Sequence, residues 1–287
     1  MGSAIRVGLD VWQHACTVAE LRQAWQTADQ GGIDNLWVYD HFRAILVEDE
    51  ATSPSYEAWT LLAAMAEVTS RARIGVMVTG NTYRHPLVVH KMAVTVDHLS
   101  DGRLELGLGA SHDPPEHAMF GLDLPEPPER VDRLREAITY MKALWSEERA
   151  DLDGTWYRLS GAVSAPAPVQ RPHPPIWIGG EGERRTLPLV ADHADVWTAI
   201  GRGSVADYAR KQHLLDELCE AAGRDPADVR RSAQVHLDAL ADVDTCRRRI
   251  GELHGVGFTE FVVIVPPPDP LPRIEALLTR ILPELRS

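Results

Sequence analysis

Two titratable side chains stand next to each other at the end of an apolar run. Asp40 and His41 follow the segment "LWVY", whose residues are typical of a buried strand. An imidazole exchanges protons near neutral pH, since its unperturbed pKa is about 6.5, and it therefore suits general acid or base catalysis. We take His41 and Asp40 as candidate catalytic residues. Their relevance depends on the fold that positions them.

Apolar segments of strand length alternate along the chain with longer segments of helical period. Eight such pairs follow one another, and several strands are apolar on both faces, as strands of a buried parallel sheet are. Eight regular pairs without a linker favour a closed α/β barrel, the (β/α)₈ TIM barrel, over an open sheet. The expected strands begin at Ile5, Asn35, Ala72, Gly102, Pro174, Asp195, Ser232 and Phe258.

The helices carry their own start and stop residues. Thr17 with Glu20 three residues later predicts a capping box, and Gly31 closes the same helix. The last helix is expected to hold Pro272 in its first turn. Its apolar stripe comprises Ile274, Leu277, Leu278, Ile281, Leu282 and Leu285.

In such a barrel, function collects at the carboxyl ends of the strands. Asp40 and His41 follow the second strand directly and therefore lie at that rim. Two long rim loops, 42–55 and 111–128, are expected to cover a substrate. We interpret 1–287 as one domain, with an irregular insertion at about 148–174 that reads as a short hairpin followed by a proline-rich crossing.

Composition excludes several classes of partner. With 29 Lys and Arg against 42 Asp and Glu, the formal charge of −13 argues against nucleic acid and anionic membrane surfaces. The three cysteines are far apart, and neither an HxH on an early strand nor an HExxH predicts a metal site. No signal peptide and no membrane-spanning run is recognisable. We therefore expect a cytoplasmic protein that acts on a small molecule.

Three segments taken together resemble one known family. They are "VYDHF", "VMVTGNTYRHPLVVHKMAVTVDHLSDGRLELGLGA" and "PPIWIGGEGERRTLPLVADHADVW". They resemble the bacterial luciferase-like flavin-dependent barrel enzymes, and most of all the branch that uses the deazaflavin coenzyme F420. The resemblance runs from about Ile5 to the last helix, and it implies a TIM barrel that is commonly a homodimer.

The resemblance assigns roles to several residues. It implies that His41 stands near the reactive ring carbon as acid, base or charge stabiliser, and that Asp40 faces the coenzyme or fixes the site. It also implies a bulged strand behind the ring, with a non-proline cis bond around Val76, Met77 and Val78. Thr79 and Asn81 would then offer polar atoms to the ring edge. The alternative is that Gly80 simply ends a strand and Asn81 makes a turn.

Two glycine-rich segments complete the expected coenzyme site. In "GLGAS", the small residues at Gly107, Gly109, Ala110 and Ser111 leave room for a flat ligand. In "IGGEG", the resemblance implies that the backbone N–H groups of Gly179, Gly180 and Gly182 cradle a phosphate tail. Arg184 and Arg185 either add positive charge there or form a solvated helix face.

The chain departs from the deazaflavin sugar dehydrogenases of the family at two places. His112 stands nearest to their catalytic carboxylate, with Asp113 and Glu116 following, and Arg43 begins the stretch where they have an aromatic residue. These departures argue against a sugar substrate and leave the proton donor open between His41 and His112. We expect His14, Trp12 and His112 to line the substrate pocket, whereas Trp37, Trp177 and Trp197 read as core.

Three functions remain open. The leading one is an F420-dependent oxidoreductase that moves a hydride between the deazaflavin and a small organic substrate. The alternative is an FMN-dependent monooxygenase that uses reduced flavin and oxygen. A third is a flavin-binding barrel without turnover, against which the intact Asp40–His41 pair counts.

Overall fold

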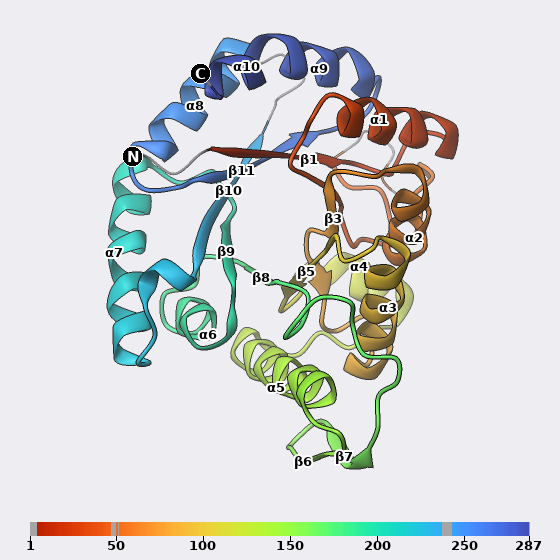
Figure 1. The fold of residues 1–287 in the computed structure, drawn as a ribbon, viewed down its shortest axis with the longest axis vertical. Coiled ribbons are helices and arrows are strands. Elements are labelled where there is room, and N and C mark those ends of the chain that lie inside the picture. Colours follow the sequence, from red (N-terminus) through yellow and green to blue (C-terminus); the bar gives the residue numbers. More distant parts are fainter. Residues whose placement is uncertain (1–4, 47–49, 51, 237–242, 287) are drawn as a thin grey trace.

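The strands close into a parallel barrel. The structure, a computed structural model, describes residues 5–46, 50, 52–236 and 243–286, and the expected TIM barrel is present in that part of the chain. The order around the barrel is β3-β2-β1-β11-β10-β9-β8-β5, and β3 pairs with β5 to close it (Figure 1). The barrel strands are β1 (Arg6–Val11), β2 (Asn35–Val38), β3 (Arg73–Val76), β4 (Thr79–Gly80), β5 (Leu104–Gly109), β8 (Ile176–Gly179), β9 (Val196–Ala199), β10 (Arg230–His236) and β11 (Glu260–Val265).

The eight expected strands all appear, with one interruption. The third expected strand is split into β3 and β4, which both pair with β5. The expected seventh strand ran to Leu240, and its last residues lie outside the described part of the chain. The parallel register sets β1 beside β2 on one side and β11 on the other.

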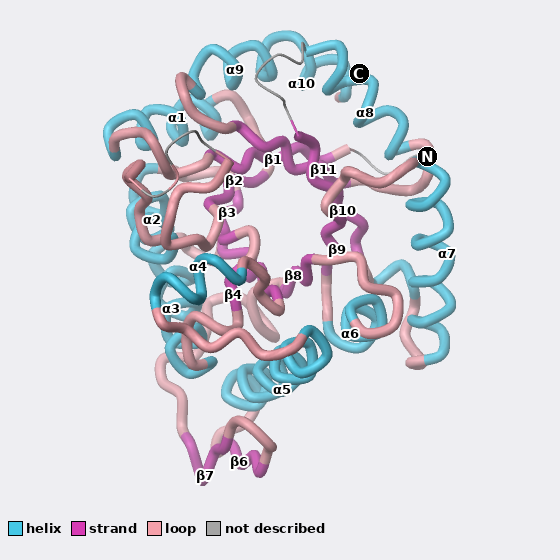
Figure 2. The backbone as a smooth tube through the Cα atoms, turned by 180° about the vertical axis from the view of Figure 1, so that it is seen from behind, coloured by secondary structure: helices cyan, strands magenta, loops and turns pink. Residues whose placement is uncertain are grey.

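Helices surround the ring of strands, as Figure 2 shows. The layer between strands and helices is the main apolar core, with Leu9, Trp25 and Leu62 among its fully buried side chains. The helical elements are α1 (Val18–Gln30), α2 (Ala58–Val68), α3 (Pro86–Leu99), α4 (Pro114–Phe120), α5 (Pro127–Ser146), α6 (Thr186–His193), α7 (Val205–Ala221), η1 (Pro226–Asp228), α8 (Val243–His254), α9 (Pro270–Ala276), η2 (Leu277–Ile281) and α10 (Leu282–Leu285). Among the described residues, none of these helices is long and apolar enough to cross a membrane.

Local sequence explains where the helices begin and end. The capping box of α1 is confirmed, since the Thr17 side chain accepts from the Glu20 amide while the Glu20 carboxylate accepts from the Thr17 amide. The last helix is less regular than its apolar stripe predicts. It begins at Pro270 and breaks into α9, η2 and α10, because Pro283 has no N–H to continue the helical ladder.

The insertion at about 148–174 and the rim loop 111–128 both contain regular secondary structure. The insertion contains the expected hairpin, in which β6 (Ala150–Asp153) pairs antiparallel with β7 (Arg158–Ala162) and projects from the barrel below α5 (Figure 2). The second rim loop contains α4, which begins at Pro114 after the Asp113 cap. This helix brings side chains from beyond β5 toward the end of β2.

The barrel interior is filled in layers, as expected when every second strand residue points inward. Trp37 from β2 and Trp177 from β8 meet across the interior with ring centroids 4.6 Å apart, and they pack with Val196 and Val262. Gly75 makes room for them, because a Cβ there would lie 2.3 Å from the Trp37 ring. Apolar side chains therefore block the barrel at mid-height.

A charged network lies beneath the two tryptophans. Glu105 and Glu260 are each 1% exposed. The Arg230 guanidinium donates to both carboxylates, at 3.0 Å and 2.9 Å, and Arg73 and the Trp177 indole also donate to Glu105. Because every buried charge here has an opposite partner, the network closes the amino end of the barrel without leaving a charge unpaired.

Removal of one carboxylate from this network is expected to lower the free energy of unfolding far more than loss of an ion pair at the surface. Glu105→Ala leaves Arg73, Arg230 and the Trp177 indole without their shared acceptor, and we expect it to lower the free energy of unfolding by about 3 kcal/mol or more. The matched control is Glu129→Ala, which removes an exposed ion pair with Arg133 on α5 and should cost less than about 0.5 kcal/mol. Urea denaturation of both variants measures the difference; equal losses would contradict the role of the network.

Candidate functional site

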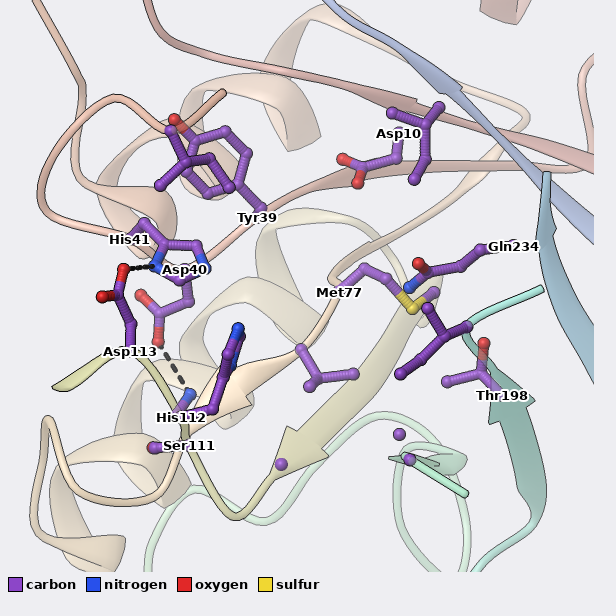
Figure 3. A pocket seen from close by; sticks show the side chains of 18 of the residues that line it. Asp10, Tyr39, Asp40, His41, Met77, Ser111, His112, Asp113, Thr198 and Gln234 are labelled. Carbon is purple, nitrogen blue, oxygen red and sulfur yellow. Dashed lines mark hydrogen bonds and ion pairs between the residues drawn. The ribbon is translucent and has the colours of Figure 1, made fainter. Parts of the chain in front are cut away.

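One cavity opens at the carboxyl ends of the strands. It has a volume of about 660 Å³, within the range of small-molecule sites. Its walls come from the ends of β1, β2, β3, β5, β8, β9, β10 and β11 and from the first rim loop, which contributes Arg43, Ile45, Leu46 and Glu50. Figure 3 shows Asp10, His41, Met77, Thr198 and Gln234 around it.

Asp40 is a structural anchor at the end of β2. The Arg84 guanidinium donates to both of its carboxylate oxygens, at 2.7 Å and 2.9 Å, and the Gly80 amide donates to one of them at 3.0 Å. Arg84 also pairs with Glu57 at 2.6 Å. Burial raises the pKa of Asp40, and the Arg84 and Gly80 hydrogen bonds oppose that rise. Asp40 thus ties the end of β2 to β4, although it also borders the cavity.

His41 is held by a buried carboxylate from α4. Its Nδ1 lies 2.9 Å from Glu116 Oε2, and the other Glu116 oxygen accepts from the backbone amides of Phe42 at 2.6 Å and Arg43 at 3.3 Å. The Tyr83 hydroxyl donates to Glu116 as well. Glu116 is fully buried, so one side chain fixes both the imidazole and the backbone that carries it.

The charge of Glu116 decides which nitrogen of His41 bears a proton. Burial acts to raise its pKa, but the hydrogen bonds from His41, Tyr83 and the Phe42 amide prevail and lower the pKa of Glu116 to about 2. An ionised carboxylate only accepts hydrogen bonds. Nδ1 of His41 is therefore the protonated nitrogen, and Nε2 is left to exchange a proton with a ligand.

His41, Asp113 and Glu116 also form a group of three possible metal ligands, whose ligand atoms lie within 4.8 Å of one another. Its two carboxylates already have hydrogen-bond donors. The Arg43 guanidinium lies 2.9 Å from Asp113, and Glu116 is surrounded by the hydrogen-bond donors given above. This arrangement favours proton handling at His41 over metal binding.

Met77 and Val78, directly after β3, form an apolar wall of the cavity, which we call the shelf. The peptide bond between Met77 and Val78 is cis, where the family resemblance implies such a bond. Gly107 and Gly109 are required by this bulge, because a Cβ would lie 2.0 Å from the Val76 carbonyl oxygen and 2.5 Å from a Val78 methyl group, respectively. The main role of these glycines is thus to make room for the backbone of the bulge. They affect the space for a ligand indirectly, because they fix where Met77 and Val78 lie.

The shelf continues to β8 and β9. Gly180 has a φ of +121°, which only glycine adopts readily, and Gly179 and Thr186 border the same side of the cavity. Thr198 is 1% exposed, and its hydroxyl has no hydrogen-bond partner among the described residues. A ligand that offers a polar edge here would satisfy it.

The structure brings most of the sequence-predicted residues to one place. Of the described residues, those that border the cavity include Trp12, Asp40, His41, Met77, Gly109, Ala110, Ser111, His112, Gly179 and Gly180. Val76, Thr79, Asn81 and Gly182 lie outside its lining, and Asn81 donates instead to the Tyr157 hydroxyl at 3.3 Å.

His14 is placed differently from the expectation. It is fully buried, and its Nδ1 meets the Tyr39 hydroxyl behind the cavity wall. Burial lowers the pKa of His14 to about 4. It supports Tyr39, and of the two it is Tyr39 that borders the cavity.

Several residues of the site were not singled out from sequence. Glu116 and Arg84 hold His41 and Asp40 from positions 75 and 44 residues further along the chain, and spacing alone does not predict such contacts. Asp10 and Gln234 could have been found from the sequence, because both are polar residues at inward-facing positions near the ends of expected strands. The positions of Trp37, Trp177 and Trp197 in the core are confirmed.

The His41–Glu116 contact predicts a tautomer that can be measured. In Glu116→Gln, the amide oxygen should keep the Phe42 and Arg43 backbone donors, which turns the amide N–H₂ toward Nδ1. We therefore expect the His41 proton to move from Nδ1 to Nε2. Nitrogen NMR of histidine-labelled protein reads this out, with Glu129→Gln on the exposed face of α5 as the control. An unchanged His41 tautomer in Glu116→Gln would refute the assignment.

Comparisons with known proteins bear on the family and the fold of this chain. A family model described as luciferase-like monooxygenase matches residues 1–263. An uncharacterised protein of Mycobacterium tuberculosis is 33% identical over 177 residues, which are 62% of this chain and 61% of that protein. The phthiodiolone/phenolphthiodiolone dimycocerosates ketoreductase of the same organism is 30% identical over 229 residues, which cover 74% of this chain and 59% of the relative. The chain thus spans about three-fifths of the length of these relatives.

Solved structures extend the likeness to nearly the whole chain. An F420-dependent secondary alcohol dehydrogenase, in complex with an F420–acetone adduct, superposes with a TM-score of 0.85 at 18% identity and covers 99% of this chain and 100% of that one. The oxygenating constituent of 3,6-diketocamphane monooxygenase from Pseudomonas putida, in complex with FMN, gives 0.75 at 17% identity and 96% of each chain. At these identities the likeness establishes the barrel alone. The family match over residues 1–263 goes further: this chain belongs to the luciferase-like monooxygenase family.

Proposed function

We propose that this protein is an oxidoreductase that binds coenzyme F420 in the rim cavity and transfers a hydride between the deazaflavin and a small organic substrate. The observation that carries the proposal is the imidazole of His41, fixed by Glu116 at 2.9 Å, on the wall of the cavity that also contains the Met77–Val78 shelf. When bound, the deazaflavin supplies a carbon that accepts or releases hydride.

The residues present fit such a ring. The shelf is apolar and continuous with Gly179 and Gly180, so a flat ring can lie close to the backbone. The hydroxyl of Thr198, which has no partner in the described part of the chain, offers a hydrogen bond to the ring edge. The Arg185 guanidinium is engaged with Asp132 at 2.8 Å, whereas Arg202 lines the cavity after β9. The Gly180 amide donates to the Thr198 carbonyl at 3.2 Å, so we assign the tail to the other backbone amides of the "IGGEG" segment.

Interconversion of an alcohol and a ketone moves a proton as well as a hydride. His41 is suited to hold that proton, because Glu116 occupies Nδ1 and leaves Nε2 to exchange it. His112 is the other candidate donor, and its ring lies 5.7 Å from that of His41. Burial lowers the pKa of His112. We assign the proton to His41, because the Glu116 carboxylate at 2.9 Å fixes its ring and leaves Nε2 for the substrate. The names of the two relatives above, a ketoreductase and an alcohol dehydrogenase, support this class of reaction.

FMN-dependent monooxygenation is the second candidate. The description of the family and the FMN complex of a structural neighbour favour it, and the lining described above does not distinguish the two rings. The two reactions differ in chemistry, because a deazaflavin has carbon at the position where reduced flavin reacts with oxygen. A homodimer and a cytoplasmic location stay predictions.

Coenzyme titration separates the two candidates. Purified protein is titrated with F420 and with FMN while the fluorescence of each is followed. We expect tight, saturable binding of F420 and markedly weaker binding of FMN. The reverse order would move the assignment to the monooxygenase.

His41→Ala is expected to retain coenzyme binding and lose turnover. Loss of a positioned acid or base lowers kcat by about 10²–10⁴-fold, whereas the shelf and the glycines that hold the ring are unchanged. His213→Ala is the control, since His213 is exposed on α7 with its side chain 78% accessible. Steady-state kinetics and the coenzyme titration together test this; unchanged turnover in His41→Ala would defeat the assignment.

A further inference from the structure

A second polar group reaches the cavity from β1, on the far side from the glycines. Strand order places β1 between β2 and β11 and opposite β8. Asp10, 3% exposed, lines the cavity on that wall. Its neighbours there are apolar and aromatic, with Trp12, Tyr39 and Ile264 in one cluster. Figure 3 shows the Asp10 carboxyl on the opposite side of Met77 from Thr198.

The Asp10 carboxyl is incompletely hydrogen-bonded. The Trp12 indole donates to Oδ2 at 3.2 Å, while Oδ1 has no partner among the residues that the structure describes. Burial raises the pKa of Asp10 to about 7, although the Trp12 hydrogen bond and the charge of His41 oppose the rise. At about pH 6 and below, the group is therefore largely a neutral acid.

Its proton can be assigned to one oxygen. An indole N–H only donates, so Oδ2, which accepts from Trp12, is the carbonyl oxygen of the acid. Oδ1 then carries the hydrogen and forms a hydroxyl donor at the cavity wall. A buried donor without an acceptor is costly, and a ligand oxygen in the cavity would remove that cost.

The opposite walls divide the cavity between two ligands. A ring that rests on the Met77–Val78 shelf and on Gly179 and Gly180 occupies the β3, β5 and β8 side. The space that remains lies between that ring and β1, where Asp10 and Trp12 are. His41, at the end of the adjacent β2, borders the same space.

We propose that Asp10 is a substrate-binding residue, which donates its carboxyl hydrogen to an uncharged oxygen of a ketone, or of the corresponding alcohol, whose flanking groups are apolar. The inference rests on the proposed function, since the ring must fill the glycine side. It adds the residues that recognise the substrate: Asp10 recognises the oxygen, and Trp12 and Ile264 contact the apolar groups. Proton exchange remains with His41.

The test uses cyclohexanone as the probe on the F420-loaded protein, with methylenecyclohexane as a probe of the same shape without the oxygen. Ligand-observed NMR gives both dissociation constants. At pH 6 we expect saturable binding of cyclohexanone, weakened about 10-fold in Asp10→Leu, as loss of one hydrogen bond predicts. Asp10→Asn keeps a donor and should stay within about threefold. Methylenecyclohexane should bind all three proteins alike.

A pH series separates Asp10 from its titratable neighbours. From pH 6 to 8.5, ionisation removes the Oδ1 donor, so cyclohexanone binding to the wild type should weaken about 10-fold, whereas Asp10→Asn should not respond. The titratable groups on the adjacent β2 end are Tyr39 and His41, and β11 presents Ile264. Both titratable groups remain in Asp10→Asn, so a pH response that survives in that variant belongs to them.

A measurement without coenzyme checks the neutral acid directly. Because burial raises the folded-state pKa of Asp10 from its ordinary value of 3.8 to about 7, folding is progressively disfavoured as the pH rises from about 4 to about 7. Asp10→Asn lacks this penalty. We therefore expect the melting temperature of Asp10→Asn, relative to that of the wild type, to rise between pH 4 and 7. Above pH 7 the difference should stay constant.

Three results would overturn the inference: no saturable binding of cyclohexanone to the loaded wild type, equal binding by Asp10→Leu, or a pH response retained in Asp10→Asn. The coenzyme titration of the same variants keeps this separate from the proposed function. F420 affinity within about twofold of wild type, together with any of those results, would leave the coenzyme assignment intact and reject Asp10. Failure of the wild type to bind F420 would instead reject the proposed function.

Discussion

The site depends on how the barrel is filled below its mouth. Trp37 and Trp177 meet at mid-height. The Trp177 indole donates to Glu105, which Arg73 and Arg230 neutralise, and the Trp37 indole donates to Asn35, whose amide donates to Glu260. The bulk of the two rings is accommodated because Gly75 leaves room beside Trp37. The floor of the cavity is thus made of buried core side chains, which suits a site that must orient a ring and a substrate.

Above that floor, the polar groups are arranged by contacts between distant segments. Asp40 is saturated by Arg84 and the Gly80 amide, and His41 is held by Glu116 from α4. The adjacent Asp40 and His41 thus have different tasks, since one ties strands together and the other is presented to the cavity. Asp10 differs from both, because its Oδ1 is left without a partner within the described part of the chain.

Much of this architecture was predictable from local patterns. The strand starting near Ile5 and the capping box at Thr17 follow from side-chain alternation and helix-end chemistry, which act over a few residues. The cis bond between Met77 and Val78 was anticipated only through the family resemblance. The break at Pro283 was obscured by an apolar stripe that continues across it. Periodicity reports which face is buried, not whether the helical ladder is continuous.

The sequence by itself determined the barrel, the rim position of Asp40 and His41, and the glycines beside the shelf, because these depend on period, strand order and backbone freedom. Only the tertiary structure decided that Glu116 holds His41, that His14 lies behind Tyr39, and that Asp10 faces the cavity with one oxygen that no described residue contacts by a hydrogen bond. Those outcomes depend on side chains that meet across the barrel from segments far apart in the chain, and on the burial that sets their protonation. Neither quantity is encoded in local spacing.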